Sequence, residues 1–198
     1  MAFFTTRVRG SNEDNRKKLV RLMQYLRNTT KMSLTFRSDG TNIFKWWVDG
    51  SYAVYPYMRS QTGGTMSLGK GAIISTSIKQ KMNTKSSIET ELIAADVLMT
   101  HILWTNYFLS WQGYNAKDTI LYQDNKSSIL LEKNGKKSIS KRTKHIAIRY
   151  YFITNRVKSD ELIIEYCPTG DIVADYYTKP LQGKKLYQFR KEIMNLKD

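Results

Sequence analysis

Cysteine is almost absent from this 198-residue chain, and its absence excludes two classes of small scaffold. The single cysteine, Cys167, cannot form an internal disulfide framework or a cysteine-built zinc site. The same scarcity favours a reducing, intracellular setting. No uninterrupted apolar run approaches about 18 residues, so we expect no membrane span. The first ten residues have a charge too early and an apolar run too short for a secretory signal.

Acidic residues are also scarce relative to basic ones. The chain has 32 Lys and Arg against 17 Asp and Glu, a net charge of +15 and a pI near 9.8. Such an excess indicates a polyanionic partner, most often nucleic acid, although a solvated basic surface is the alternative. The cations cluster: residues 133–158 contain nine Lys or Arg and no acid, together with Tyr150, Tyr151 and Phe152. Aromatic rings beside cations can stack on bases, so nucleic acid is the favoured partner.

Apolar residues are present in the proportion of a folded domain, at 41% of the chain with 12% aromatic. Their periodicity predicts a mixed five-stranded sheet flanked by helices, which is an α/β fold. The loop at 38–42 is the expected boundary between an N-terminal helical segment, 1–41, and a domain at 42–198. The predicted strands are 43–54, 65–74, 75–83, 119–125 and 161–168, and the predicted helices are 11–29, 87–111, 126–135, 142–158 and 172–196, the last interrupted near 180–183.

Two local features of these elements follow from residue type. Ser11 is the expected cap of the first helix, because serine side chains accept hydrogen bonds from the first amides of a helix. The Thr-Gly-Gly run at 62–64 is expected to be a turn between the first two strands, because glycine adopts turn conformations at little cost.

Acidic residues stand at the ends of several predicted elements. Asp49 ends the first strand, Asp124 ends the fourth and Asp175 opens the last helix, while Glu91 lies near the start of the long helix. Glu89 competes with Glu91, but Ala94, Ala95 and Leu98 follow Glu91 on its own face, so Glu91 is expected to point inward. Asp49 alone could be an ordinary turn carboxylate. Four converging carboxylates would repel one another unless hard cations such as Mg²⁺ or Mn²⁺ bound them, which favours a metal-dependent nuclease or polynucleotidyl transferase.

Five motifs in this order extend the interpretation. They are VDGSYA, KSSIETELIAA, LYQDNKSSILL, KRTKHIAIRYYFI and VADYYTKPL. As a set they resemble the ribonuclease H domain of copia-type LTR retrotransposon polyproteins, over roughly residues 43–185. The segment FFTTRVRGSNEDNRKKLVRLMQYLRNT resembles the region that follows the reverse-transcriptase core in those polyproteins. The resemblance implies a ribonuclease H fold, an association with a reverse-transcriptase domain, and hydrolysis of the RNA strand of RNA–DNA hybrids. It also implies that Asp49, Glu91, Asp124 and Asp175 form the catalytic tetrad and bind two Mg²⁺ ions.

Residues outside the acidic set are candidates for contacts with the hybrid. Small groups near the acids could read the 2′-hydroxyl of RNA, although turn and cap chemistry explains them equally well, with Ser127 as a helix cap. Basic residues of the 133–158 segment are expected to bind phosphates. The full set is Gly50, Ser51, Asn125, Ser127, Lys141, Arg142, Lys144 and Arg149.

One expected residue type is missing. Relatives of the implied family often carry a histidine in the loop before the last acid, but this loop, CPTGDIVAD, has none, and the two histidines are His101 and His145. The resemblance therefore does not extend to product release or proton transfer by such a histidine. Two other functions are alternatives to ribonuclease H activity. One is a catalytically silent module that binds nucleic acid or a partner, which the lack of any one of the four acids would have indicated. The other is a transposase or integrase core, which shares the fold but usually needs only three acids, and the motifs here do not match it.

Overall fold

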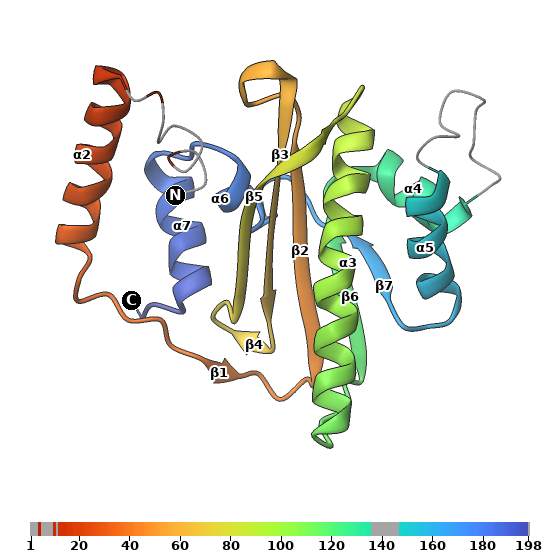
Figure 1. The fold of residues 1–198 in the computed structure, drawn as a ribbon. Coiled ribbons are helices and arrows are strands. Elements are labelled where there is room, and N and C mark those ends of the chain that lie inside the picture. Colours follow the sequence, from red (N-terminus) through yellow and green to blue (C-terminus); the bar gives the residue numbers. More distant parts are fainter. Residues whose placement is uncertain (1–3, 5–9, 11, 136–146, 198) are drawn as a thin grey trace.

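A mixed five-stranded sheet forms the centre of the computed structural model, which describes residues 4, 10, 12–135 and 147–197. Across the sheet the strands are β5 (Ile74–Asn83), β3 (Arg59–Ser67), β2 (Ile43–Ser51), β6 (Asp118–Gln123) and β7 (Ile163–Tyr166). The β5, β3 and β2 strands pair antiparallel, whereas β6 pairs parallel with both β2 and β7 (Figure 1). The predicted α/β class with a mixed five-stranded sheet is confirmed.

Helices lie on both sides of this sheet (Figure 1). The long helix α3 (Ser87–Trp111), with α4 (Lys126–Asn134) and α5 (Ala147–Lys158), lies on one side. On the other side α6 (Asp175–Thr178) and α7 (Gly183–Met194) lie closer to the sheet, and α2 (Glu13–Asn28) is outermost. The remaining elements are short: β1 (Arg37–Ser38) pairs with β4 (Gly69–Lys70), and η1 (Pro56–Met58) precedes β3. The predicted break in the C-terminal helix is confirmed between α6 and α7.

Side chains of β2 alternate between the two faces, and this alternation positions the end of the strand. Trp46 and Val48 belong to the main core with Leu98 of α3, whereas Trp47 packs against a second cluster that contains Ile172. Because successive residues of a strand face opposite ways, Asp49 shares the Trp47 face and Gly50 approaches α3. The last residues of β2 therefore present groups on both faces of the sheet.

Helix α3 is the main core helix. By length and composition alone it could cross a membrane, but Leu92, Leu98, Met99 and Ile102 are almost completely buried against the sheet and neighbouring helices. Helices that are buried in the core of a domain are apolar enough to satisfy the same criterion.

Two local sequence predictions are wrong. Strand β3 begins at Arg59, and the glycines expected in a turn lie inside it. Gly63 faces α6, where an added Cβ would come within 2.8 Å of Tyr177 Cβ, and at Gly64 it would come within 2.5 Å of a Leu98 methyl group. These glycines therefore permit close packing rather than a turn. Helix α2 is capped by Asn12, whose side chain accepts a hydrogen bond from the Asn15 amide; the expected cap, Ser11, lies outside the described residues.

Candidate active site

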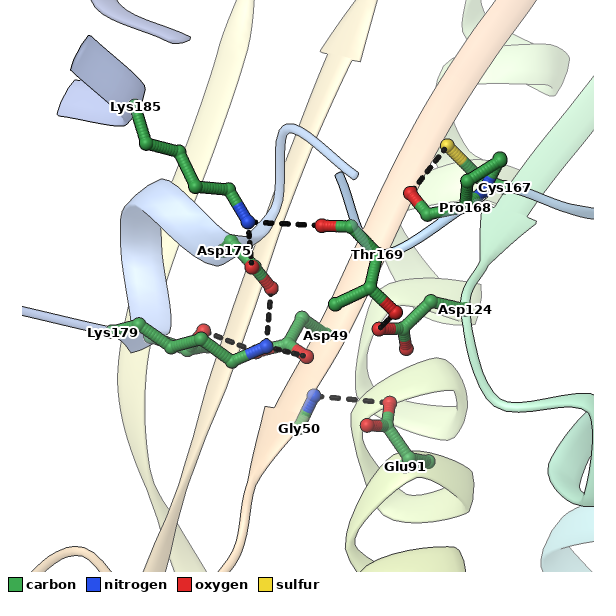
Figure 2. Close-up of polar contacts among 11 residues, drawn as sticks. Asp49, Gly50, Glu91, Asp124, Cys167, Pro168, Thr169, Asp175, Lys179 and Lys185 are labelled. Carbon is green, nitrogen blue, oxygen red and sulfur yellow. Dashed lines mark hydrogen bonds and ion pairs between the residues drawn. The ribbon is translucent and has the colours of Figure 1, made fainter. Parts of the chain in front are cut away.

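Three aspartates converge at one edge of the sheet (Figure 2). Asp49 lies near the end of β2, Asp124 directly follows β6, and Asp175 begins α6. Strands β2 and β6 are parallel neighbours in a register that pairs Trp47 with Tyr122, so the residues two positions further on meet at the same edge. One carboxylate oxygen from each aspartate lies within 4.8 Å of the others. Asp49 and Asp175 have side chains only 2% and 1% exposed.

Glu91 approaches the aspartates from α3. Its Oε2 accepts a 3.0 Å hydrogen bond from the Gly50 amide, and it lines an open cavity of about 560 Å³ together with Asp49 and Asp124. The approach requires glycine in β2, because a Cβ on Gly50 would lie 2.8 Å from the Thr90 carbonyl oxygen. The competing acid, Glu89, accepts a hydrogen bond from the Lys85 amide, while the Ser86 hydroxyl accepts one from the Glu89 amide. Glu89 therefore belongs to the N-terminal cap of α3.

Two lysines that sequence reasoning missed neutralise part of this charge. Lys179 Nζ lies 2.5 Å from Asp175 Oδ1 and 3.4 Å from Asp49 Oδ1. Lys185 Nζ lies 3.1 Å from Asp175 Oδ2 and also donates to the Thr169 carbonyl oxygen at 2.9 Å. The only sequence signal was the four-residue spacing between Asp175 and Lys179, which places an acid and a base on one side of a helical turn.

Hydroxyl groups hold two of the aspartates. Thr178 Oγ1 donates to Asp49 Oδ2, and Thr169 Oγ1 donates to Asp124 Oδ2 at 3.0 Å. Both threonines come from the segment around Asp175, so this segment contacts the ends of both β2 and β6. Figure 2 shows the contact between Thr169 and Asp124. Two short side chains thus orient the carboxylates relative to each other.

Burial and mutual repulsion raise the pKa of two of the acids. Burial raises the pKa of Asp49, and the nearby Lys179 ammonium only partly offsets this effect. Burial, followed by the charges of Asp49 and Asp124, raises the pKa of Glu91 well above its ordinary value. For Lys179 burial lowers the pKa, but the carboxylates of Asp49 and Asp175 outweigh burial and raise it overall. The carboxylates of this cluster therefore repel one another, and cations bound beside them stabilise their charged forms.

Another buried carboxyl group contacts the residue before Asp124. Glu132 of α4 is fully buried and accepts hydrogen bonds from Gln123 Nε2 at 3.0 Å and from Ser128 Oγ at 3.2 Å. Burial raises its pKa to about 8, with the two hydrogen bonds opposing the shift. Because Gln123 immediately precedes Asp124, this contact ties the end of β6 to α4.

Four of the eight residues expected to contact nucleic acid lie beside the acids. Gly50, Ser51, Asn125 and Ser127 line the same cavity as the acids. The expectation that Ser127 caps α4 is wrong: Asn125 is the cap, and its Oδ1 accepts hydrogen bonds from the amides of Ser127 and Ser128, both at 3.1 Å. The predicted cap was two positions too late because serine and asparagine cap helices equally well.

The basic candidates lie elsewhere. Arg149 forms a 3.1 Å ion pair with Asp96 of α3 and does not line the acidic cavity. Lys141, Arg142 and Lys144 lie outside the described residues, as does His145, whereas His101 is exposed on α3. The structure thus brings the four acids and four small polar candidates together and leaves Arg149 apart from them.

The donor set fits a hard divalent cation. Asp49, Asp124 and Asp175 offer carboxylate oxygens that are close enough to share an ion, and Glu91 adds a fourth carboxylate at the cavity wall. Mg²⁺ and Mn²⁺ prefer such oxygen ligands. Among the described residues no cysteine or histidine joins this group.

Comparisons with known proteins agree with this geometry. The chain is 32% identical over 176 residues to the retrovirus-related Pol polyprotein from transposon TNT 1-94 of Nicotiana tabacum, which covers 88% of this chain. It is 29% identical over 184 residues to the corresponding polyprotein from transposon RE1 of Arabidopsis thaliana, which covers 91%. The chain is an RNase H-like domain related to copia-type retrotransposon Pol polyproteins. It spans 13% and 12% of the length of these two relatives. No protein-family model matches this chain.

Solved structures show the same fold. Superposition on LC11-RNase H1 in complex with an RNA/DNA hybrid gives a TM-score of 0.50 at 13% identity, covering 68% of this chain and 93% of that one. The N-terminal RNase H domain of Rv2228c from Mycobacterium tuberculosis also gives 0.50, at 10% identity, covering 75% and 96%.

Proposed function

We propose that this domain is a Mg²⁺-dependent endonuclease that hydrolyses the RNA strand of RNA–DNA hybrids. The observation that carries the proposal is the cluster of Asp49, Asp124 and Asp175, whose oxygens lie within 4.8 Å of one another, with Glu91 lining an open cavity beside Asp49 and Asp124. Relatives named as retrotransposon Pol polyproteins support the biological setting, and the likeness to an RNase H1 solved with a hybrid supports the substrate class. The retention of all four acids favours this function over a silent binding module.

In this proposal the carboxylates hold the metal ions and the surrounding groups hold the carboxylates. Asp49, Asp124 and Asp175 would share the ions, with Glu91 completing the set from α3. When bound, two Mg²⁺ ions can activate a water molecule and stabilise the leaving oxygen in phosphodiester cleavage. Thr178 and Thr169 orient Asp49 and Asp124, and the Gly50 amide orients Glu91.

Substrate contacts follow from the groups around the acids. We assign Ser51, Asn125 and Ser127, which line the cavity, as candidates for contacts with the 2′-hydroxyl that distinguishes RNA from DNA. Gly50 would contribute space rather than its amide, because that amide already donates to Glu91. We assign the phosphates of the hybrid to the basic 133–158 segment, including Lys141, Arg142 and Lys144.

A reverse-transcriptase domain is the proposed protein partner, with residues 1–41 as the connecting segment. Helix α2 of this segment leaves Leu19, Val20, Met23 and Leu26 about half exposed. The relatives that the chain matches are several times longer than the chain itself. An apolar helix face beside the nuclease is what a neighbouring polymerase domain could cover.

The test is a cleavage assay with four substrates of one sequence: RNA–DNA hybrid, RNA duplex, DNA duplex and single-stranded RNA. We expect the RNA strand of the hybrid to be cut in Mg²⁺, the other three to be left intact, and EDTA to abolish cutting. Asp124→Asn should lose this activity, and Asp160→Asn, with its substitution in an exposed turn outside the cavity, serves as its matched control. Binding of the hybrid without cleavage in either Mg²⁺ or Mn²⁺ would instead support the silent module.

A further inference from the structure

The ammonium group of Lys179 and a divalent cation require the same oxygen atoms. Lys179 Nζ contacts Oδ1 of Asp175 at 2.5 Å and Oδ1 of Asp49 at 3.4 Å, and it lines the acidic cavity. Both aspartates belong to the group whose oxygens lie close enough to share an ion. The lysine thus bridges two of the three carboxylates that would ligate a metal (Figure 2).

Protein donors contact every oxygen of these two carboxylates. Asp175 Oδ1 is paired with Lys179 and its Oδ2 with Lys185, while Asp49 Oδ2 accepts from Thr178 and its Oδ1 faces Lys179. A divalent ion that binds both aspartates must therefore displace at least one of these donors. Two cations at one pair of oxygens would repel strongly in a site with buried ligands.

Lys179 is the donor that has to move. Lys185 makes a second hydrogen bond, to the Thr169 carbonyl oxygen at 2.9 Å, and contacts only Asp175 among the acids. Thr178 is a neutral donor on a single oxygen. Lys179 places its charge between Asp49 and Asp175, and its side chain is about one-third exposed. Because the lysine side chain is long and flexible, its ammonium group can move away from the aspartates into the open cavity that it lines.

We propose that Lys179 is an internal counter-ion that competes with divalent metal for Asp49 and Asp175, so that metal binding includes displacement of its ammonium group. The inference rests on the proposed metal-dependent function and adds a regulator of metal affinity to it. Lys179 holds the carboxylates together when no divalent ion is bound and weakens metal binding by the interaction it must give up.

The experiment measures Mn²⁺ binding by titration calorimetry at pH 8 without nucleic acid. Wild type is compared with Lys179→Met and with Lys184→Met, which removes the same charge from an exposed position on α7 outside the cavity. We expect Lys179→Met to bind Mn²⁺ at least tenfold more tightly and Lys184→Met to match the wild type. Thermal unfolding gives a second readout: Lys179→Met should melt lower than wild type in EDTA and gain more from saturating Mn²⁺.

Unchanged or weaker Mn²⁺ affinity in Lys179→Met would overturn the inference. If that variant does not fold in EDTA, Lys179→Arg replaces it: the charge is kept, so its affinity should not exceed that of the wild type, and a tenfold gain would contradict the inference. The two proposals fail in different ways. Hybrid cleavage by the wild type with equal affinities in all variants removes only the role of Lys179, whereas no Mn²⁺ binding to any variant removes both.

Discussion

Buried carboxyl groups at two places in this protein are stabilised by opposite means. At the sheet edge, Asp49 and Asp175 are almost fully buried and face the ammonium groups of Lys179 and Lys185. Behind β6, Glu132 is fully buried among neutral partners, and its pKa of about 8 favours the protonated form at neutral pH. A carboxylate paired with a cation can exchange that cation for a metal, whereas Glu132 does not line the cavity and its contacts with Gln123 and Ser128 support the packing of α4 on β6.

Changing a carboxylate to an amide in each region should distinguish a catalytic role from a structural one. The larger effect is expected at the sheet edge. At the sheet edge, Asp124→Asn removes a metal ligand and relieves repulsion with Asp49 and Glu91. We expect hydrolysis of the hybrid to fall by about 10²–10³-fold, which corresponds to several kcal/mol of lost transition-state stabilisation. The melting temperature should be unchanged or slightly higher. Turnover equal to that of wild type would remove Asp124 from the metal site.

The packing of β2 against α3 gives the next largest effect. In Gly50→Ala the new methyl group would meet the Thr90 carbonyl oxygen at 2.8 Å and push β2 away from Glu91. We expect a loss of about 1–3 kcal/mol in the free energy of unfolding together with a marked loss of activity. Gly170→Ala is the matched control, because a Cβ there meets nothing within 4 Å. Equal stability of the two variants in urea titration would show that the approach of Glu91 does not depend on Gly50.

In the core the carboxylate-to-amide change should act on stability and its pH dependence. The pKa of Glu132 is about 8 in the folded protein against an ordinary value of 4.5. A carboxyl group with a raised pKa stabilises the fold fully below its unfolded pKa, and this contribution is lost as the pH rises through about 8. Glu132→Gln keeps a neutral partner for Gln123, so it should be more stable than wild type by roughly 1–3 kcal/mol at pH 9 and nearly equal at pH 5. Unfolding titrations at both pH values decide this, and a parallel pH dependence in the two proteins would contradict it.

The basic segment 133–158 is expected to give the smallest effect, on affinity alone. Neutralising Lys141, Arg142 and Lys144 should raise the Michaelis constant for the hybrid several-fold and leave the rate at saturation almost unchanged. If about four cations contact phosphates, the wild-type slope of log affinity against log salt is about −3 to −4, and the triple variant should flatten it. Neutralising Lys17, Arg21 and Lys31 in and beside α2 is the matched control. Equal slopes in wild type and the first triple variant would show that this segment is only a solvated surface.

The elements with regular patterns were predictable from the sequence, and the contacts across space were not. Alternation and length predicted β2, β6, β7 and α3, and the acids at the ends of those elements suggested the site. Strand β3 was misplaced because Gly63 and Gly64 look like a turn, and their packing against α6 and α3 is visible only in three dimensions. Lys179 and Lys185 were missed for a related reason, since nothing in a local pattern shows which carboxylates a lysine will reach.

The same limit explains the cap of α4 and the isolation of Arg149. Asn125 and Ser127 are both good caps, and only the backbone path at the end of β6 decides between them. Arg149 belongs to a basic stretch of sequence, yet it pairs with Asp96 on the neighbouring helix. Charge clustering along the chain therefore indicates a partner class without locating the surface that binds it.

The most direct test of the metal site is the position of a bound metal ion. Crystals of the protein grown with Mn²⁺ should show an anomalous peak about 2.0–2.6 Å from oxygens of Asp49 and of Asp124 or Asp175. The Lys179 ammonium should then lie outside hydrogen-bonding distance of at least one of its two carboxylates. A strong Mn²⁺ peak elsewhere, with these aspartates still paired to Lys179 at saturating metal, would contradict both the metal site and the role of its lysine.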